Sequence, residues 1–329
     1  MPAELQWLTR SQIDASAWDA CVAASLQPIV YGYSWYLDSV LPDSGWKWEG
    51  LVLSDDAGHY RAIMPVPLRR KCVLGIDYDW VVHQPLFCQM LGVFSYDTSV
   101  DIDLFLCTLY QRYRYCSTLS INRQPVGGSP LASFLIKRLG THVLDLSIGY
   151  QALFRNYTKD RKLNLRRAKA AQWVVIDSFD PTPLVTLFRA NHAVGIPGGV
   201  AEWAYDTFIS LVQELHRRQL ITLRYATYSG RIEAGALFVR EGNRVIYLFN
   251  AASEAGRRGN ARTLLIDQVL QDYAGKPMVF DFESPEKPSI VSFYRSFGAV
   301  EEPFEMICWS RLSQLERGLL QVRNKLWAR

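Results

Sequence analysis

One stretch, residues 244–299, constrains the fold more than any other part of this 329-residue chain. It begins with a short apolar run rich in β-branched and aromatic residues, Arg244–Phe249, which is typical of a buried strand. A turn at Gly256–Ala261 precedes a helix expected over about 262–273, and a second short strand follows at Met278–Phe282. Two buried strands joined by a helix favour a parallel pair with a crossover connection.

A last helix is expected over Ser289–Phe297. Pro288 suits the first turn of a helix, and Gly298 suits the left-handed residue that follows a helix end. The stretch therefore predicts the order strand, turn, helix, strand, helix.

The turn before the first of these helices is a candidate anion site, because a helix start carries unpaired N–H groups and a positive dipole end. Gly259 and Ala261 are small enough for the backbone to approach a phosphate closely. Arg257 and Arg258 add positive charge, and Asn260 completes the turn. A plain surface turn is the alternative, since glycine–arginine turns before helices are common.

These motifs resemble the GNAT acyltransferase superfamily. Its phosphate loop follows Gln/Arg-x-x-Gly-x-Gly/Ala, and this chain has Gly-x-x-Gly-x-Ala over Gly256–Ala261, so the leading Gln or Arg is missing. A second signature, Tyr-x-x-x-Gly before an apolar residue, occurs over Tyr294–Ala299. With Phe-Asp-Phe-Glu-Ser at 280–284, the stretch is most similar to the FemAB-like branch, whose chains carry two GNAT folds in tandem.

The resemblance implies a donor site. The two strands would part to admit the pantetheine arm of acetyl-CoA or another acyl-CoA, and the turn at 256–261 would hold the pyrophosphate. Phe249 and Asn250 would line this site, with Asn250 able to orient the acceptor or a backbone group. Tyr294 would protonate the departing thiolate; a core tyrosine on a helix is the alternative.

Two acidic residues are candidates for the general base. Asp281 and Glu283 alternate in the predicted second strand, so they are expected to share one face, with Phe282 on the other. Either carboxylate could accept the amine proton directly or through water. Glu283 could instead cap the following turn.

The first half of the chain contains the same kinds of parts in a similar order, which suggests an internal duplication. We therefore predict an α/β (α+β) chain of two tandem GNAT-like domains, each a mixed central sheet flanked by helices. A degenerate N-terminal domain is expected over 1–146, a C-terminal domain with the donor site over 147–310, and a C-terminal amphipathic helix over 311–329.

The apolar segment 81–95 has two interpretations. By the resemblance, it borders the cleft between the domains. From its residues alone, it is a buried strand with a turn at Gly92, in which His83 and Gln89 are hydrogen-bonded internally.

A strongly basic segment opens the second half. Its apolar stripe, Leu163, Ala168 and Ala170, is thin, so most of a helix over 157–171 must be solvated or face an anion. A tRNA is one candidate partner for the basic residues at 159–169; a solvated helix face is the alternative.

The function implied by the resemblance is an acyl-CoA-dependent N-acyltransferase acting on an unknown amine, either a small molecule or a peptide. Two alternatives stay open. One is a Fem-type transferase that uses aminoacyl-tRNA to modify a cell-wall precursor, which the basic segment favours. The other is a non-catalytic GNAT scaffold, which the missing Gln or Arg at Gly256 favours.

Composition sets broader limits. Hydrophobic residues make up 49% and charged residues 21% of the chain, as in a folded globular protein. A net charge of +4 suits anionic ligands without predicting nucleic-acid binding by itself. Scattered cysteines and histidines predict no metal site, and no apolar run approaches the roughly 20 residues of a membrane span. With no secretory signal, we expect a cytoplasmic protein; the sequence predicts no oligomeric state.

Overall fold

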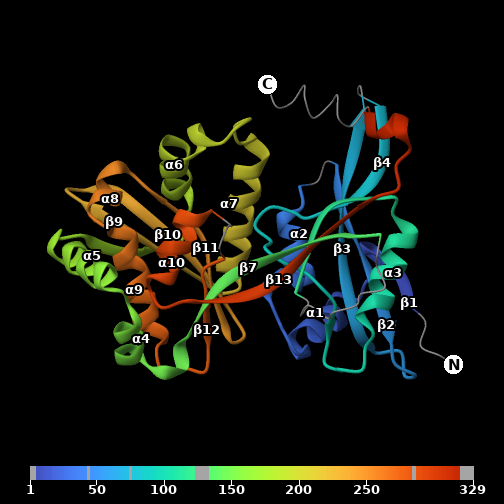
Figure 1. The fold of residues 1–329 in the computed structure, drawn as a ribbon, viewed down its shortest axis with the longest axis horizontal. Helices are drawn as coiled ribbons and strands as arrows, with labels where there is room; N and C mark the ends of the chain where they lie inside the picture. Colours follow the sequence, from blue (N-terminus) through green and yellow to red (C-terminus); the bar gives the residue numbers. More distant parts are fainter. Residues whose placement is uncertain (1–4, 43–44, 74–75, 123–132, 284–286, 319–329) are drawn as a thin grey trace. The chain divides into compact units, whose positions relative to one another are not determined.

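The computed structural model describes residues 5–42, 45–73, 76–122, 133–283 and 287–318. The chain divides into two compact units. The first unit comprises residues 1–139 and 303–329, and the second comprises residues 140–302 (Figure 1). Each unit contains a mixed sheet flanked by helices, so the predicted fold class is confirmed.

The sheet of the second unit has the strand order β7-β12-β11-β10-β9-β8. Every neighbouring pair is antiparallel except β11 and β12, which are parallel as predicted. A hairpin around Ser229 and Gly230 joins β9 to β10. The strands are β7 (Leu135–Asp145), β8 (Val174–Ser178), β9 (Ile221–Tyr228), β10 (Arg231–Glu241), β11 (Arg244–Ala252) and β12 (Val279–Asp281).

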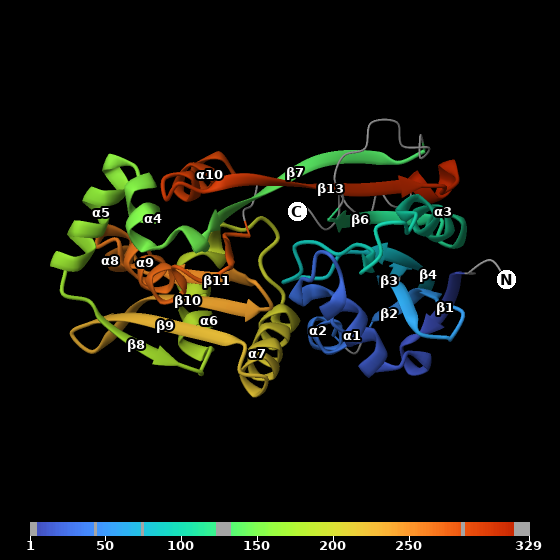
Figure 2. The same ribbon diagram turned by 90° about the horizontal axis from the view of Figure 1, so that it is seen from below.

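Helices cover both faces of this sheet (Figure 2). On one face, α6 and α7 pack on Phe249 of β11 through Phe188 and Phe208. On the other, α4, α5, α9 and α10 share a buried apolar cluster with Tyr247 of the same strand. The helices are α4 (Tyr150–Asn156), α5 (Lys159–Ala170), α6 (Thr182–Asn191), α7 (Glu202–Arg217), α8 (Glu254–Arg258), α9 (Ala261–Tyr273) and α10 (Pro288–Arg295), with short 3₁₀ turns at Leu146–Ile148 and Ala193–Gly195.

The basic helix α5 has a different buried stripe from the predicted one. Leu163 and Ala170 are exposed, whereas Arg161, Leu165 and Ala168 are buried at i, i+4 and i+7. The reason is that α5 packs on α9 through this side. One arginine of the basic segment therefore lies on the inner side of its helix.

The first unit has the strand order β1-β2-β3-β4-β6-β13, and β5 pairs with β3. β2 and β3 form a hairpin around Asp55–Gly58. β4 and β6 are parallel and are connected through α3, which begins after Asp101. The strands are β1 (Leu5–Thr9), β2 (Trp46–Ser54), β3 (Tyr60–Val73), β4 (Ile76–His83), β5 (Phe94–Ser95), β6 (Tyr115–Ile121) and β13 (Val300–Ser310).

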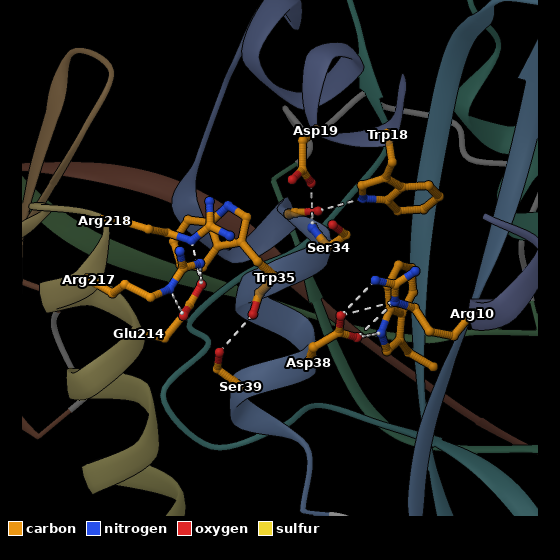
Figure 3. Close-up of polar contacts among 12 residues, drawn as sticks. Arg10, Trp18, Asp19, Ser34, Trp35, Asp38, Ser39, Glu214, Arg217 and Arg218 are labelled. Atoms are coloured by element: carbon orange, nitrogen blue, oxygen red, sulfur yellow. Dashed lines mark hydrogen bonds and ion pairs between the residues drawn. The ribbon is translucent and has the colours of Figure 1, made fainter. Parts of the chain in front are cut away.

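Polar contacts fix the helices of the first unit to its sheet. Asp38 of α2 accepts hydrogen bonds from Nε and a terminal nitrogen of Arg10, with Nε 2.9 Å from Oδ1 (Figure 3). The same carboxylate accepts a hydrogen bond from Trp48 Nε1 on β2 at 2.8 Å. The helices are α1 (Ala15–Ala24), α2 (Ser34–Val40) and α3 (Ile102–Arg112), with 3₁₀ turns at Arg10–Gln12 and Val30–Gly32.

The predicted C-terminal helix is only partly within the described residues. Residues 314–318 are helical, and residues 319–329 lie outside the described part of the chain. Among the described residues, no helix has both the length and the apolar character needed to cross a bilayer.

Candidate functional site

The parallel strands β11 and β12 pair over only three residues. The pairs are Arg244 with Val279, Val245 with Phe280, and Ile246 with Asp281. β12 ends at Asp281, and Glu283 then has a positive φ of 49°. β11 continues to Ala252, so its edge beyond Ile246 has no partner strand among the described residues.

A β-bulge lies in the unpaired part of β11. Opposite β10, Phe249 pairs with Leu237 and Tyr247 pairs with Phe238, which leaves Leu248 as an extra residue. Such a bulge increases the local twist and redirects the side chains that follow it. It therefore helps to carry the strand away from β12.

The helix after β11 begins without a side-chain cap. Gly259 (φ −81°, ψ 7°) is followed by Asn260 in the left-handed region (φ 55°, ψ 29°). This succession forms a nest, in which consecutive N–H groups point toward a common position suited to an anion. No atom in the described part of the chain accepts the N–H groups of Ala261 or Arg262. The predicted helix start is confirmed, and its amides are available to a ligand.

The segment predicted as a turn, Gly256–Ala261, is partly helical. Its first residues belong to α8, which is capped by the Ser253 hydroxyl accepting the Gly256 N–H at 3.0 Å. A Cβ at Gly256 would lie 2.1 Å from the Glu233 carbonyl oxygen, and one at Gly259 would lie 2.2 Å from the Trp173 ring. Packing on β10 and on Trp173 therefore requires these two glycines.

Arginine side chains surround this helix start. Arg257 donates to the Ala252 carbonyl at 2.8 Å, whereas Arg258 is exposed and forms an ion pair with Glu254. Arg262 donates to Oδ1 of Asn250 at 2.9 Å, so Asn250 is linked directly to the second residue of α9.

Arg161 brings a buried positive charge to the same helix. Only 6% of its surface is exposed. It donates to the hydroxyls of Thr263 at 2.6 Å and Ser296 at 2.8 Å, and its guanidinium lies 4.1 Å from the centre of the Phe293 ring. No carboxylate of the described residues forms an ion pair with it. Burial, and to a lesser extent Arg262, lowers the pKa of Arg161 to about 10.

Tyr294 lies in the aromatic cluster beneath the parted strands. Its ring stacks on Phe282 at 4.5 Å between centroids, and 6% of the residue is exposed. Its hydroxyl forms no hydrogen bond with the described residues. Burial raises the pKa of Tyr294 well above its ordinary value, with Tyr247 adding to the rise. The phenol is therefore protonated at neutral pH and able to donate.

The two candidate carboxylates differ in their surroundings. Asp281 is fully buried; it forms an ion pair with Arg244 at 2.6 Å and accepts hydrogen bonds from Thr141 Oγ1 and from the Glu283 N–H. The expected alternation of Asp281 and Glu283 along one strand is wrong, because β12 ends at Asp281 and Glu283 is left-handed. Asp281 instead fixes the turn that carries Glu283.

Phe249 lies on the opposite face of the sheet from Tyr247 and Tyr294. Its ring packs at 4.4 Å on Phe208 and at 5.0 Å on Phe188. Close by, His192 accepts the N–H of Ala252 through Nε2 at 3.3 Å. Burial, together with Arg262 and Arg257, lowers the pKa of His192, so the ring is neutral at pH 7.

Sequence reasoning missed four residues of this site: Arg161, Trp173, Tyr247 and Arg262. Arg161 had a usable signal, because it stands at helical spacing with Leu165 and Ala168. Tyr247 and Trp173 look like ordinary core aromatics in the sequence. No group of His, Cys, Asp and Glu side chains suited to a metal ion occurs in the described ranges.

The sequence of residues 152–285 matches the family model described as an acetyltransferase (GNAT) domain. No curated protein sequence matches the chain. The crystal structure of FemX is similar over 92% of this chain and 96% of its own, with a TM-score of 0.65 and 11% identity. L-PGS from Bacillus licheniformis is similar over 96% and 98%, with a TM-score of 0.53 and 13% identity. A conserved protein of unknown function from Bacteroides thetaiotaomicron VPI-5482 is similar over 94% and 100%, with a TM-score of 0.55 and 9% identity. At these identities the structural likenesses show the fold alone; the family-model match, together with the fold shared with FemX, supports the predicted resemblance to GNAT and FemAB-like chains.

Proposed function

Because residues 152–285 form a GNAT-type acyltransferase domain, we propose that the chain transfers an acyl group from an acyl-CoA to the nitrogen of an amine. The observation that carries the choice of donor is the uncapped start of α9 beside the parted edge of β11, with arginines around it.

The positive charge around α9 supports a phosphorylated donor. The open amides of Ala261 and Arg262 would bind the pyrophosphate oxygens, which is favoured at a helix N-terminus. Arg161 and Arg262 form no ion pair with the described carboxylates, so a bound phosphate would neutralise charge that the protein leaves uncompensated. In this proposal Arg257 and Arg258 add to the positive electrostatic potential at the helix start. Gly259 and Asn260 form the backbone nest that binds the anion.

The parted strands suit the narrow pantetheine arm. Edge N–H and C=O groups of β11 beyond Ile246 would pair with its amides, as a neighbouring strand would. Asn250 and Phe249 would lie along this arm, one on each side of the strand. Such alignment places the thioester at a fixed position, which lowers the entropic part of the barrier.

In the proposed reaction the neutral amine attacks the thioester carbonyl, the C–N bond forms and the C–S bond breaks. Tyr294 gives its phenolic proton to the departing sulfur and recovers a proton from solvent. The amine proton passes to Glu283, directly or through water. Glu283 suits this step better than Asp281, because Glu283 is partly exposed whereas Asp281 is fully buried in an ion pair with Arg244.

An aminoacyl-tRNA donor is the second candidate, with a cell-wall precursor as acceptor. It is favoured by the exposed basic side of α5, where five cationic residues form no ion pair with the described residues. They are Lys159, Lys162, Arg166, Arg167 and Lys169. Such a surface would contact RNA phosphates, and binding would weaken steeply with added salt.

Calorimetry with acetyl-CoA and with an aminoacyl-tRNA separates the two donors. We expect saturable acetyl-CoA binding, unaffected by Arg166→Met, and release of free CoA thiol with members of a panel of primary amines and peptides. If only the tRNA binds, and Arg166→Met weakens that binding, the Fem-type alternative replaces the proposal. Binding of neither, with no thiol release, would favour the non-catalytic scaffold.

A further inference from the structure

Tyr247 carries a buried hydroxyl. The residue lies on β11 directly before the bulge, and 2% of its surface is exposed. Its Oη makes no hydrogen bond of normal geometry with the described residues, although the Arg262 guanidinium interacts with it and lowers its pKa. A buried polar group left unpaired costs free energy, and a native one usually has a reason.

Packing alone does not supply that reason. The Tyr247 ring fills the cluster between Phe238, stacked at 5.2 Å, and Phe282, edge-on at 6.4 Å. Phenylalanine would fill the same space without burying an unpaired oxygen. The hydroxyl is therefore best explained by a state of the protein in which it does have a partner.

The neighbours of Tyr247 indicate which partner. Tyr294 lies edge-on to it with ring centroids 6.3 Å apart. Arg262 is a shared cationic neighbour, because its charge lowers the pKa of both phenols. Burial raises the pKa of Tyr247 to about 12, and Arg262 limits that rise, whereas the pKa of Tyr294 lies higher still. Both phenols are therefore protonated in the free protein, and the Tyr247 hydroxyl is able to donate a hydrogen bond.

We propose that Tyr247 is a positioning residue whose phenol stabilises the phenolate formed on Tyr294 when Tyr294 protonates the leaving group. This inference rests on the proposed function. The Tyr294 O–H bond breaks as the S–H bond forms; the Tyr247 hydroxyl then donates a hydrogen bond to the Tyr294 oxygen, and Arg262 balances the negative charge. Water returns the proton to Tyr294 as the products leave.

Tyr247→Phe tests the proposal, with Tyr225→Phe as the matched control. Tyr225 is a buried tyrosine of the same unit, but its hydroxyl donates to the Asp180 carbonyl at 2.6 Å. In the ligand-free protein, Tyr247→Phe should keep or raise the melting temperature, whereas Tyr225→Phe should lower it. A clear loss of melting temperature in Tyr247→Phe would overturn the inference, because the hydroxyl would then have a partner in the free state.

Catalysis gives the second readout, with thiol release measured using the best amine of the panel. We expect Tyr247→Phe to lower kcat by about tenfold, as for a group that assists proton transfer, with acetyl-CoA affinity unchanged. The defect should be larger with the oxygen-ester analogue of acetyl-CoA, because an alkoxide needs its proton more than a thiolate does. Tyr225→Phe should lose nothing on either donor.

The outcomes distinguish a failure of the inference about Tyr247 from a failure of the proposed function. If the wild type turns over acetyl-CoA but Tyr247→Phe shows an equal kcat, or an equal defect with both donors, only the inference about Tyr247 is overturned. If the wild type neither binds nor turns over acetyl-CoA, the proposed function fails and the inference fails with it.

Discussion

The two units contain the same arrangement, a parallel strand pair joined by a helix, but among the described residues its strand edge is paired in the first unit and unpaired in the second. In the first unit the edge of β6 is filled by the chain itself: Gln84 N–H donates to Thr118 at 2.9 Å, and Leu91 N–H donates to Ser120 at 2.8 Å. In the second unit the pairing of β11 and β12 stops after Ile246 and Asp281.

The helices of these two arrangements, α3 and α9, also differ at their N-termini. α3 is capped by its own Asp101, whose carboxylate accepts the Asp103 N–H at 2.9 Å, and these residues border a cavity of about 460 Å³ with Asp97. α9 has no side-chain cap and faces Arg161 and Arg262. The same topology thus gives the first unit a paired strand edge beside acidic residues and the second unit an unpaired strand edge beside arginines. The second arrangement is the one that suits a phosphorylated donor.

The largest expected difference between the two units comes from removing the proposed general acid, Tyr294. Tyr294→Phe should lower kcat by about a hundredfold or more, the usual range for loss of a general acid. The control is Tyr113→Phe in the first unit, a buried phenol whose hydroxyl donates to Glu49 at 2.8 Å. That variant should lose stability and keep its kcat; equal losses in the two variants would contradict a donor site confined to the second unit.

A buried histidine in the first unit, His83, should also make the stability of the protein depend on pH. His83, which ends β4 and shares a hydrogen bond with Ser117, has its pKa lowered to about 4 by burial and by Lys71 and Arg69. The unfolded chain binds this proton near pH 6.5, so stability is complete above that pH and falls as the pH drops toward 4.

The loss over this window should be at most about 3 kcal/mol for a shift of this size. Urea unfolding of the wild type and of His83→Gln at pH 7 and pH 4.5 measures it. The variant should lose less stability on acidification. Equal slopes would mean that His83 carries no part of the acid sensitivity.

The charge at the open end of the second unit can be removed without leaving a buried carboxylate unpaired. Arg161→Met should weaken acetyl-CoA binding by about tenfold, the lower range for a hydrogen bond to a charged group, and should not reduce stability. By comparison, Arg61→Met in the first unit removes an arginine bound to Asp97 and should leave donor binding unchanged. Calorimetry and thermal unfolding of both variants give the result, and unaltered donor affinity in Arg161→Met would refute the assigned phosphate contact.

The smallest expected effect comes from placing an acidic residue at the start of α9, as Asp101 is placed at the start of α3. Asn260→Asp places a carboxylate at the start of α9, in a left-handed position that aspartate tolerates. We expect higher stability of the free protein and donor binding weakened by about two- to fivefold, the scale of a single charge at a helix end. Asp101→Ala should instead cost about 1 kcal/mol of stability, with donor binding intact. Tighter acetyl-CoA binding in Asn260→Asp would contradict a phosphate at this position.

Sequence patterns predicted the order of the elements over 244–299 because hydrophobic periodicity, Pro288 and Gly298 are local signals. The parallel pairing followed from two short buried strands around one helix. The site depended on longer-range packing. Arg161 is buried only because α5 packs on α9, about a hundred residues away in the chain, and its neighbours in the sequence carry the same charge.

Two further features depend on contacts distant in the chain and could not be predicted from the local sequence. The glycines at 256 and 259 look like phosphate-loop residues but are required by Glu233 and Trp173. The closure of the first unit depends on where residues 84–91 meet β6. The internally bonded interpretation of 81–95 is only partly right: His83 shares a hydrogen bond with Ser117, but the strand ends at His83 and the buried Gln89 Oε1 has no partner among the described residues.

The most direct test is a crystal structure of the protein soaked with acetyl-CoA. The account predicts electron density for the pantetheine arm along β11 beyond Ile246, with pyrophosphate oxygens within hydrogen-bonding distance of the Ala261 and Arg262 amides. Acetyl-CoA bound instead beside α3, or a second unit whose strand edge stays unoccupied at saturating acetyl-CoA, would contradict it.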